Sequence, residues 1–240
     1  MTKALLVARR ELGSYARSPL GAVILAGALL IDGILFYYFG LSKKMLSAEV
    51  LTEFFYAASG VQMAASLVLS MRLIAEERQT HTFTLLNTAP IADWEIVLGK
   101  YLSALGMLGL LTALTLYMPA LIFVNGKVSI GHIAVGYTGL FLIGSATIAI
   151  GLFASALTRS QVVAVIVGAA ILAALILMWM LASAAEPPLN SFLAGLAFHH
   201  QNYQPFQKGI LELRGVAYYV AVTYFFLLSA TKILEARRWR

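Results

Sequence analysis

The sequence predicts an all-α integral membrane protein with six transmembrane helices, and two observations lead to this prediction. Hydrophobic residues make up 60% of the 240 positions, charged residues only 12%, and the mean hydropathy is +0.84. A soluble domain has about 45–50% apolar and about 25% charged residues, so lipid must surround most of this chain. Six apolar runs also reach the roughly 17–25 residues that a membrane-crossing helix needs. They are 19–41, 54–74, 101–124, 132–157, 162–183 and 215–234.

The charge and cysteine content exclude several other classes of function. The absence of cysteine excludes disulfides, thiolate metal sites and a cysteine nucleophile. A net charge of +6 would suit a nucleic-acid partner in a soluble protein. In a membrane protein the placement of the charges matters more than their sum. We therefore expect a lipid bilayer around the chain and no nucleic-acid partner.

Before the first apolar run, residues 1–17 have the pattern of an amphipathic helix. Lys3, Arg9, Arg10, Glu11 and Arg17 alternate with apolar residues such as Leu5, Leu6 and Leu12. No small-residue cleavage pattern of a signal peptide follows. We expect an interfacial helix lying along the membrane, the alternative being a frayed basic tail.

The fourth and sixth runs carry further structural signals. The fourth is rich in small residues that let helix backbones approach closely in a bundle. These are Gly136, Gly139, Gly144, Ser145, Ala146, Ala149 and Gly151. The sixth requires Lys232 to extend its charged end towards the interface.

The basic residues predict the orientation of the spans. Alternating six spans places twelve Lys and Arg residues on the side of the two termini and five on the other. Cytoplasmic segments carry the excess of basic residues, so both termini should be cytoplasmic. With no linker and no internal repeat, residues 1–240 form a single transmembrane domain. Its sizeable non-spanning pieces are the inner segment 75–100 and the outer loop 184–214.

The inner segment has the pattern of a short helix–turn–helix. Charged residues end one span, Pro90 marks a turn, and Asp93 is placed to cap the following helix. Gly99 is expected to break that helix before the next span. One apolar side with charges at both ends suits docking to a soluble partner, and a hydrated loop touching lipid headgroups is the alternative.

The same segment resembles a known family. Its pattern E-E-R-x-T-x-T-x-x-L-L-x-x-x-P-I, followed by I-V-x-G-K, is similar to the signature of the permease subunits of type-2 ABC exporters. The closest similarity is to permeases of gliding motility and of nitrous-oxide reductase assembly. The C-terminal sequence F-F-L-L-S-A-T-K-I-L-E-A-R-R-W-R adds to the resemblance, which covers nearly the whole chain. His81 stands where the family usually has glycine, and we interpret it as a surface variant.

The resemblance implies a membrane subunit of the bacterial inner membrane whose ATP and Mg²⁺ are bound by partners. Two ATPase subunits and a second permease chain, identical or homologous, would complete the exporter. Carried over by motif, the ATPase-coupling residues would be Glu76, Glu77, Arg78, Thr80, Thr82, Phe83, Leu85, Leu86, Pro90, Gly99 and Lys100. A second ATPase contact would be the N-terminal helix with Arg9, Arg10 and Glu11.

Alternative functions remain open at this point. The chain has no G-x-x-x-x-G-K-[ST] phosphate loop, so we do not expect it to be an enzyme with its own ATP site. A membrane-embedded enzyme would need a converging set of acid, base and nucleophile that the sequence does not provide. A non-transporting anchor of a motility or metal-site assembly complex is the remaining alternative.

Three residues are candidates for a role in the path of the cargo. An ionisable side chain inside a span is costly, so Asp32 is a candidate for the translocation path, a buried hydrogen-bonded carboxyl being the alternative. His199 and His200 are candidates for an outer gate. Because adjacent helical side chains diverge, we expect no metal site there.

The outer loop is expected to dip into the membrane. The stretches 191–200 and 206–211 are apolar enough for short re-entrant helices, punctuated by Pro187, Pro188 and Pro205. Aromatic residues near the span ends, including Phe54, Phe55 and Tyr219, are expected to form an interfacial belt.

Overall fold

A computed structural model describes residues 3–41, 46–80, 91–125 and 128–238, and these are almost entirely helical. The elements are α1 (Lys3–Arg17), α2 (Pro19–Leu35) continuing into the π-helix η1 (Phe36–Leu41), α3 (Ser47–Gln79), α5 (Asp93–Leu114), α6 (Tyr117–Asn125), α7 (Ile130–Leu157), α8 (Gln161–Ala184), α9 (Leu189–Leu196), α10 (His200–Gln207) and α11 (Leu213–Arg238).

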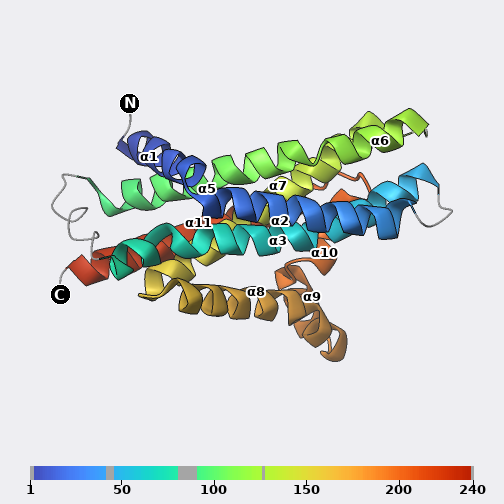
Figure 1. The fold of residues 1–240 in the computed structure, drawn as a ribbon. Coiled ribbons are helices and arrows are strands. Elements are labelled where there is room, and N and C mark those ends of the chain that lie inside the picture. The colour runs from blue at the N-terminus through green and yellow to red at the C-terminus, as the bar shows by residue number, and fades with distance from the viewer. Residues whose placement is uncertain (1–2, 42–45, 81–90, 126–127, 239–240) are drawn as a thin grey trace.

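In the described part of the chain, six helical segments are long and apolar enough to cross a membrane, which confirms the predicted number. They are α2 with η1, α3, α5 with α6, α7, α8 and α11, and they run alongside one another with both chain ends at the same end of the bundle (Figure 1). The second extends beyond the predicted 54–74 at both ends, because it begins at Ser47 and continues to Gln79.

Helices α7 and α3 form the centre of the bundle and pack closely against each other. The small residues of α7 make this possible, as predicted. A Cβ atom on Gly136 would lie 2.2 Å from the Phe55 ring, and one on Gly151 would lie 1.9 Å from Ser70 Oγ. By contrast α2, α8 and α11 are peripheral, with large exposed apolar faces.

The third span is divided at Thr115 and Leu116, where α5 ends and α6 begins. Pro119 explains the break, because it has no N–H to donate to the carbonyl of Thr115 in a continuous helix. Instead the N–H of Met118 donates to Thr115 O at 3.0 Å, a tighter turn than that of an α-helix.

At Gly99 the prediction of a helix break was wrong. The helix α5 runs without interruption from Asp93 to Leu114, and it begins after Ala92, whose N–H donates to Glu95 Oε2 at 3.1 Å, so Asp93 is not its cap. Gly99 is present because α1 crosses at this point. A Cβ atom there would lie 2.6 Å from Ala4 O and 2.7 Å from Val7 Cβ. Residues 93–100 are therefore the start of a span and not a separate surface helix.

The outer loop contains two short helices, but with other boundaries than predicted. They are α9 and α10, and the expected helix over 206–211 is wrong because α10 ends at Gln207 and Gly209 has a φ of +77°. Pro205 lies inside α10 and not between two helices. The carbonyl of Leu175 in α8 accepts the N–H of Phe198 at 3.1 Å, which fixes the turn between α9 and α10 to the bundle.

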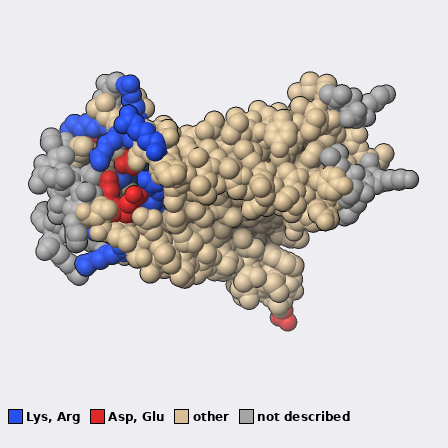
Figure 2. Space-filling view, viewed as in Figure 1, with Lys and Arg blue, Asp and Glu red and all other residues tan. Residues whose placement is uncertain are grey.

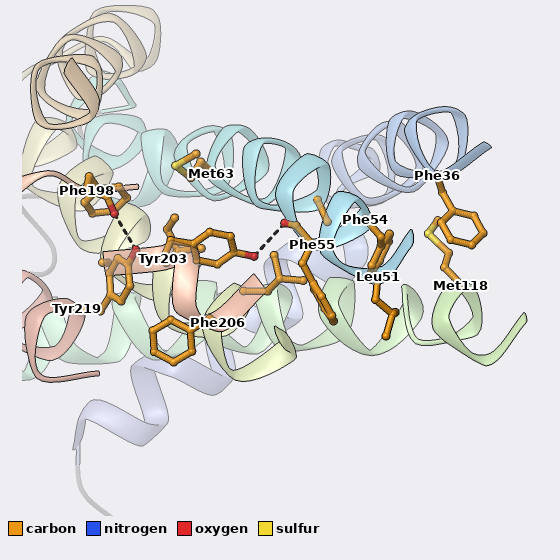
Figure 3. Close-up of a cluster of buried hydrophobic side chains, with 14 of the residues drawn as sticks. Phe36, Leu51, Phe54, Phe55, Met63, Met118, Phe198, Tyr203, Phe206 and Tyr219 are labelled. Atoms are coloured by element: carbon orange, nitrogen blue, oxygen red, sulfur yellow. Dashed lines mark hydrogen bonds between the residues drawn. The ribbon is translucent and has the colours of Figure 1, made fainter. Parts of the chain in front are cut away.

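The largest apolar core lies where α3, α7, α10 and α11 meet (Figure 3). Tyr203 donates its hydroxyl to Phe55 O at 2.9 Å, and Tyr219 donates to Phe198 O at 2.7 Å. Phe54, Phe55 and Tyr219 are buried, so the belt interpretation was wrong for these three. They join the outer helices to the spans.

Substitution of Gly99 tests the packing of α1 on α5. We expect Gly99→Leu to displace α1 and lower the melting temperature in detergent by several degrees, because the new side chain would overlap α1. Gly109→Leu on the same helix is the control, since its Cβ position has no atom within 4 Å. Equal melting of the two variants would contradict the close contact.

Candidate functional site

The most unusual side chain in the bundle is Lys100, which is buried with only 1% of its side chain exposed. Its Nζ lies 2.9 Å from Glu77 Oε1 and 3.2 Å from Glu11 Oε1. A buried ammonium group is stable only when it is paired and hydrogen-bonded. Because Glu11 belongs to α1, Glu77 to α3 and Lys100 to α5, this triad joins three helices.

A second set of contacts fixes α1 to α3 beside the triad. Arg72 forms an ion pair with Glu76 at 2.7 Å, and its guanidinium lies 4.9 Å from the centroid of the Tyr15 ring. The Tyr15 hydroxyl donates to Leu69 O at 2.7 Å, and Arg72 Nη1 donates to Ser18 Oγ at 3.4 Å. Both ends of the α1–α2 junction are thus attached to α3.

The end of α3 is also attached to the end of α7. Arg78 Nη1 donates to the carbonyls of Ala156 and Thr158. Ser155 Oγ accepts the N–H of Ala75 at 2.9 Å and donates to Met71 O at 2.8 Å. The acidic–basic motif at 76–78 therefore contacts two other helices, α5 through Glu77 and α7 through Arg78.

Six charged side chains surround a polar cavity of about 170 Å³ at this end of the bundle. They are called the charged cluster below and are Arg10, Glu11, Arg72, Glu76, Glu77 and Lys100. Three cations face three carboxylates, so the cluster is close to neutral. Figure 2 shows most of the visible charged side chains gathered at one end of the molecule, with an uncharged middle and one acidic group at the tip of the protrusion below the bundle. This is the end that holds both chain termini (Figure 1).

The structure brings together only part of the predicted coupling set. Glu11, Glu76, Glu77, Arg78 and Lys100 gather here, and Thr80 follows directly at the end of α3. Gly99 underlies α1, whereas Arg9 and Arg10 are exposed. Thr82, Phe83, Leu85, Leu86 and Pro90 lie outside the described residues.

Sequence reasoning missed Tyr15, Arg72 and Ser155 as members of this region. The spacing of Arg72 and Glu76, four residues apart on one helix, was a usable signal for an ion pair. Nothing in the sequence indicated Ser155, because a serine inside an apolar helix has no distinguishing neighbours.

At the opposite half of the bundle the two candidate histidines point in different directions, as predicted. His199 Nε2 lies 2.8 Å from Ser59 Oγ, and the His199 ring packs against Tyr56 and Tyr203. Since Ser59 Oγ donates its own hydrogen to Tyr56 O, it accepts from His199. His200 instead stacks on Trp179, with ring centroids 4.9 Å apart.

Asp32 is buried in α2 and lies apart from both regions. Its exposure is 3%, and Oδ1 accepts no hydrogen bond from the part of the chain that is described. The neighbouring Gly33 faces the Tyr117 hydroxyl and Met118 at the start of α6. Among the described residues there is no group of three His, Asp or Glu side chains placed to hold a metal ion.

Comparison with protein-family models gives a match over residues 20–231 to the ABC-2 family transporter protein. The chain belongs to the ABC-2 transporter family. No curated protein matches the chain significantly. The match extends from the first span into the last, so this ABC-2 protein is a membrane permease component of an ABC transporter and a multi-pass membrane protein. A permease of this family is the transmembrane component and not the ATP-binding subunit, and the family associates generally with ABC ATPases.

Removal of Lys100 tests the charged triad of the permease. We expect Lys100→Met to destabilise the fold by about 3–5 kcal/mol, because it removes the cation that pairs with Glu11 and Glu77 in a largely buried site. The triple variant Lys100→Met, Glu11→Gln, Glu77→Gln should recover most of this loss. Thermal unfolding in detergent measures both, and a single variant as stable as the parent would disprove the triad's role.

A pH titration tests the environment of His199. Burial of the His199 ring lowers its pKa to about 4, and the nearby His200 contributes a smaller part of this decrease. As the pH falls, His199 therefore becomes protonated in the unfolded chain before it does so in the folded protein. The free energy of unfolding should decrease as the pH drops from about 6.5 to about 4, with a slope approaching about 1.4 kcal/mol per pH unit. His199→Gln should flatten the melting-temperature profile over this window. An unchanged profile would show that another group titrates.

Proposed function

We propose that this permease is the membrane half of an exporter driven by two separate ATPase subunits. Two permease chains, identical or homologous, pair in the membrane, and ATP and Mg²⁺ are bound by the ATPases. The observation that carries the proposal is the buried triad of Glu11, Glu77 and Lys100. It makes the N-terminal helix and the ends of two spans behave as one mechanical unit.

Coupling requires a body that receives force and transfers it to the spans. Residues 81–90 connect the end of α3 to the start of α5. The Glu77–Lys100 ion pair joins these two helices to each other, and the Lys100–Glu11 ion pair joins α5 to α1. A partner that moves this connection therefore tilts α1, α3 and α5 together. Rigid-body motion of this kind is one of the usual forms of conformational switching.

The contact surface for the ATPase is proposed to lie around this body. Glu11, Glu77 and Lys100 pair with one another inside the bundle. We therefore expect them to support the docking surface without contacting the ATPase. Exposed Arg9 and Arg10, together with Trp94 at 53% exposure, remain available at the same end of the bundle. We include residues 81–90 in this surface on the strength of the family motif.

The orientation follows from the same proposal. The charged end faces the cytoplasm of a bacterium, the permease lies in the inner membrane, and α1 lies at the inner interface with Leu5 and Leu6 exposed. The helices α9 and α10 are re-entrant on the outer side, where His199 and His200 contribute to the exit of the path. Asp32 belongs to the path between the spans.

A second permease chain has an available surface in this account. An apolar groove of about 460 Å³ lies between α2 and α3 and includes Gly27 and Gly60, whose Cβ positions have no atom within 4 Å. Small residues let the backbone of another transmembrane helix approach closely. On the basis of the sequence resemblance, we assign this permease to the subgroup that includes the permeases of gliding motility and of nitrous-oxide reductase assembly.

Exchange of residues 81–90 for a Gly-Ser sequence of equal length tests the proposed function. We expect the cognate ATPase to be lost from affinity purifications, whereas the melting temperature of the permease stays close to that of the parent because both ends of the exchanged piece are held independently. Arg9→Glu should weaken co-purification in the same direction.

The matched control is the same exchange at residues 42–45, which connect η1 and α3 at the opposite end. That variant should retain the ATPase. Full ATPase retention after exchange of 81–90 would contradict the proposed docking surface, and loss in both variants would contradict its location.

A further inference from the structure

A large cavity lies in the half of the molecule away from the charged cluster. It has a volume of about 770 Å³ and is formed by the end of α8, by α9 and α10, and by the residues leading into α11. Figure 1 shows that α9 and α10 end short of η1 and α6 along the bundle axis. The cavity is therefore beside the spans and not beyond them.

Three charged side chains line this cavity without partners. Lys208, Glu212 and Arg214 form no ion pair with one another or with any other residue that the structure describes. Their charges sum to +1, in contrast with the neutral cluster at the other end. A ligand with a single negative charge would neutralise this net charge of +1. A phosphodiester has one negative charge, whereas a phosphomonoester has more than the cavity can neutralise.

Neutral groups in the same cavity are suited to a polar headgroup. Gln201, Gln204 and Asn190 supply amide donors and acceptors. Trp179 forms one wall, with His200 stacked on it at an interplanar angle of 23°. Tryptophan at such a position is typical of surfaces that are apolar on one side and wet on the other.

Apolar side chains are exposed in the cavity and on the elements that form it. Trp179 and Ile210 line the cavity and are 40% and 54% exposed. Leu181 of α8 is 54% exposed, Phe192 of α9 is 66% exposed and Leu213 is 82% exposed. Together they place apolar surface next to an unpaired cationic pocket. An amphiphile matches this pairing, with its head in the cavity and its chains along α8 and α9.

We propose that this cavity binds an amphiphile with a singly charged phosphodiester head, such as a membrane phospholipid. Lys208 and Arg214 hold the phosphate, Glu212 accepts hydrogen bonds from the hydroxyl groups of the head, and Trp179 packs against its glycerol. Binding needs no ATPase, so the proposal stands or falls separately from the exporter function.

Tryptophan fluorescence of the full chain tests the proposal, because Trp179 lies in the cavity. With Trp94→Phe and Trp239→Phe as the background, Trp179 is the sole tryptophan. The protein is placed in bilayers that contain brominated phosphatidylglycerol or brominated phosphatidylcholine, which has the same phosphate but no net charge. We expect apparent affinity about tenfold higher for phosphatidylglycerol, since charge-assisted hydrogen bonds dominate.

The variant Lys208→Gln, Arg214→Gln should reduce this preference to about one, while Arg17→Gln, Arg159→Gln at the opposite end should leave it unchanged. Equal quenching by the two brominated lipids would overturn the proposal, as would a preference that survives the double variant. Inorganic phosphate at millimolar concentration should not reverse the quenching. Reversal would show that the cavity binds free phosphate and not an amphiphile.

Discussion

The buried ammonium group of Lys100 is the interaction on which the rest of the structure depends. A lysine with 1% exposure in a largely apolar chain is tolerated only because carboxylates from two other helices reach it. Separating either helix would break one of the two buried ion pairs of Lys100. This makes α1, α3 and α5 difficult to move independently, although they belong to distant parts of the sequence.

The two halves of the bundle are held by different kinds of interaction. Ion pairs hold the end with the termini, whereas buried aromatic rings and single hydroxyl donors, such as Tyr203 to Phe55 O, hold the half that contains α10. The central helix α7 connects them, because its glycines bring it into close contact with α3 along most of its length. In the proposed mechanism, movement of the charged end is transferred through this tight packing to the outer helices and the cavity beside them.

Hydrophobic runs were enough to predict six spans, and the family motif drew attention to Glu76–Arg78, Glu11 and Lys100. What the sequence could not show was which surface each residue meets. Gly99 has the same sequence signal whether it ends a helix or makes room for α1, and only the packing decides. Phe55 and Tyr219 stand where interfacial aromatics are common, yet the outer helices fold over them. The end of α10 depended on Gly209, whose positive φ a local pattern does not reveal.

The most direct test of the central claim is a distance measurement between α1 and α5 during the ATPase cycle. Because the chain has no cysteine, spin labels can be attached at Ala16→Cys of α1 and Leu102→Cys of α5 alone; both positions are exposed and lie outside the proposed docking surface. The account predicts one distance distribution that is the same without nucleotide and in a vanadate-trapped complex, while the distance from Ala16→Cys to Val162→Cys on α8 changes. A shift or splitting of the Ala16–Leu102 distribution between the two states would contradict a rigid unit built on Lys100.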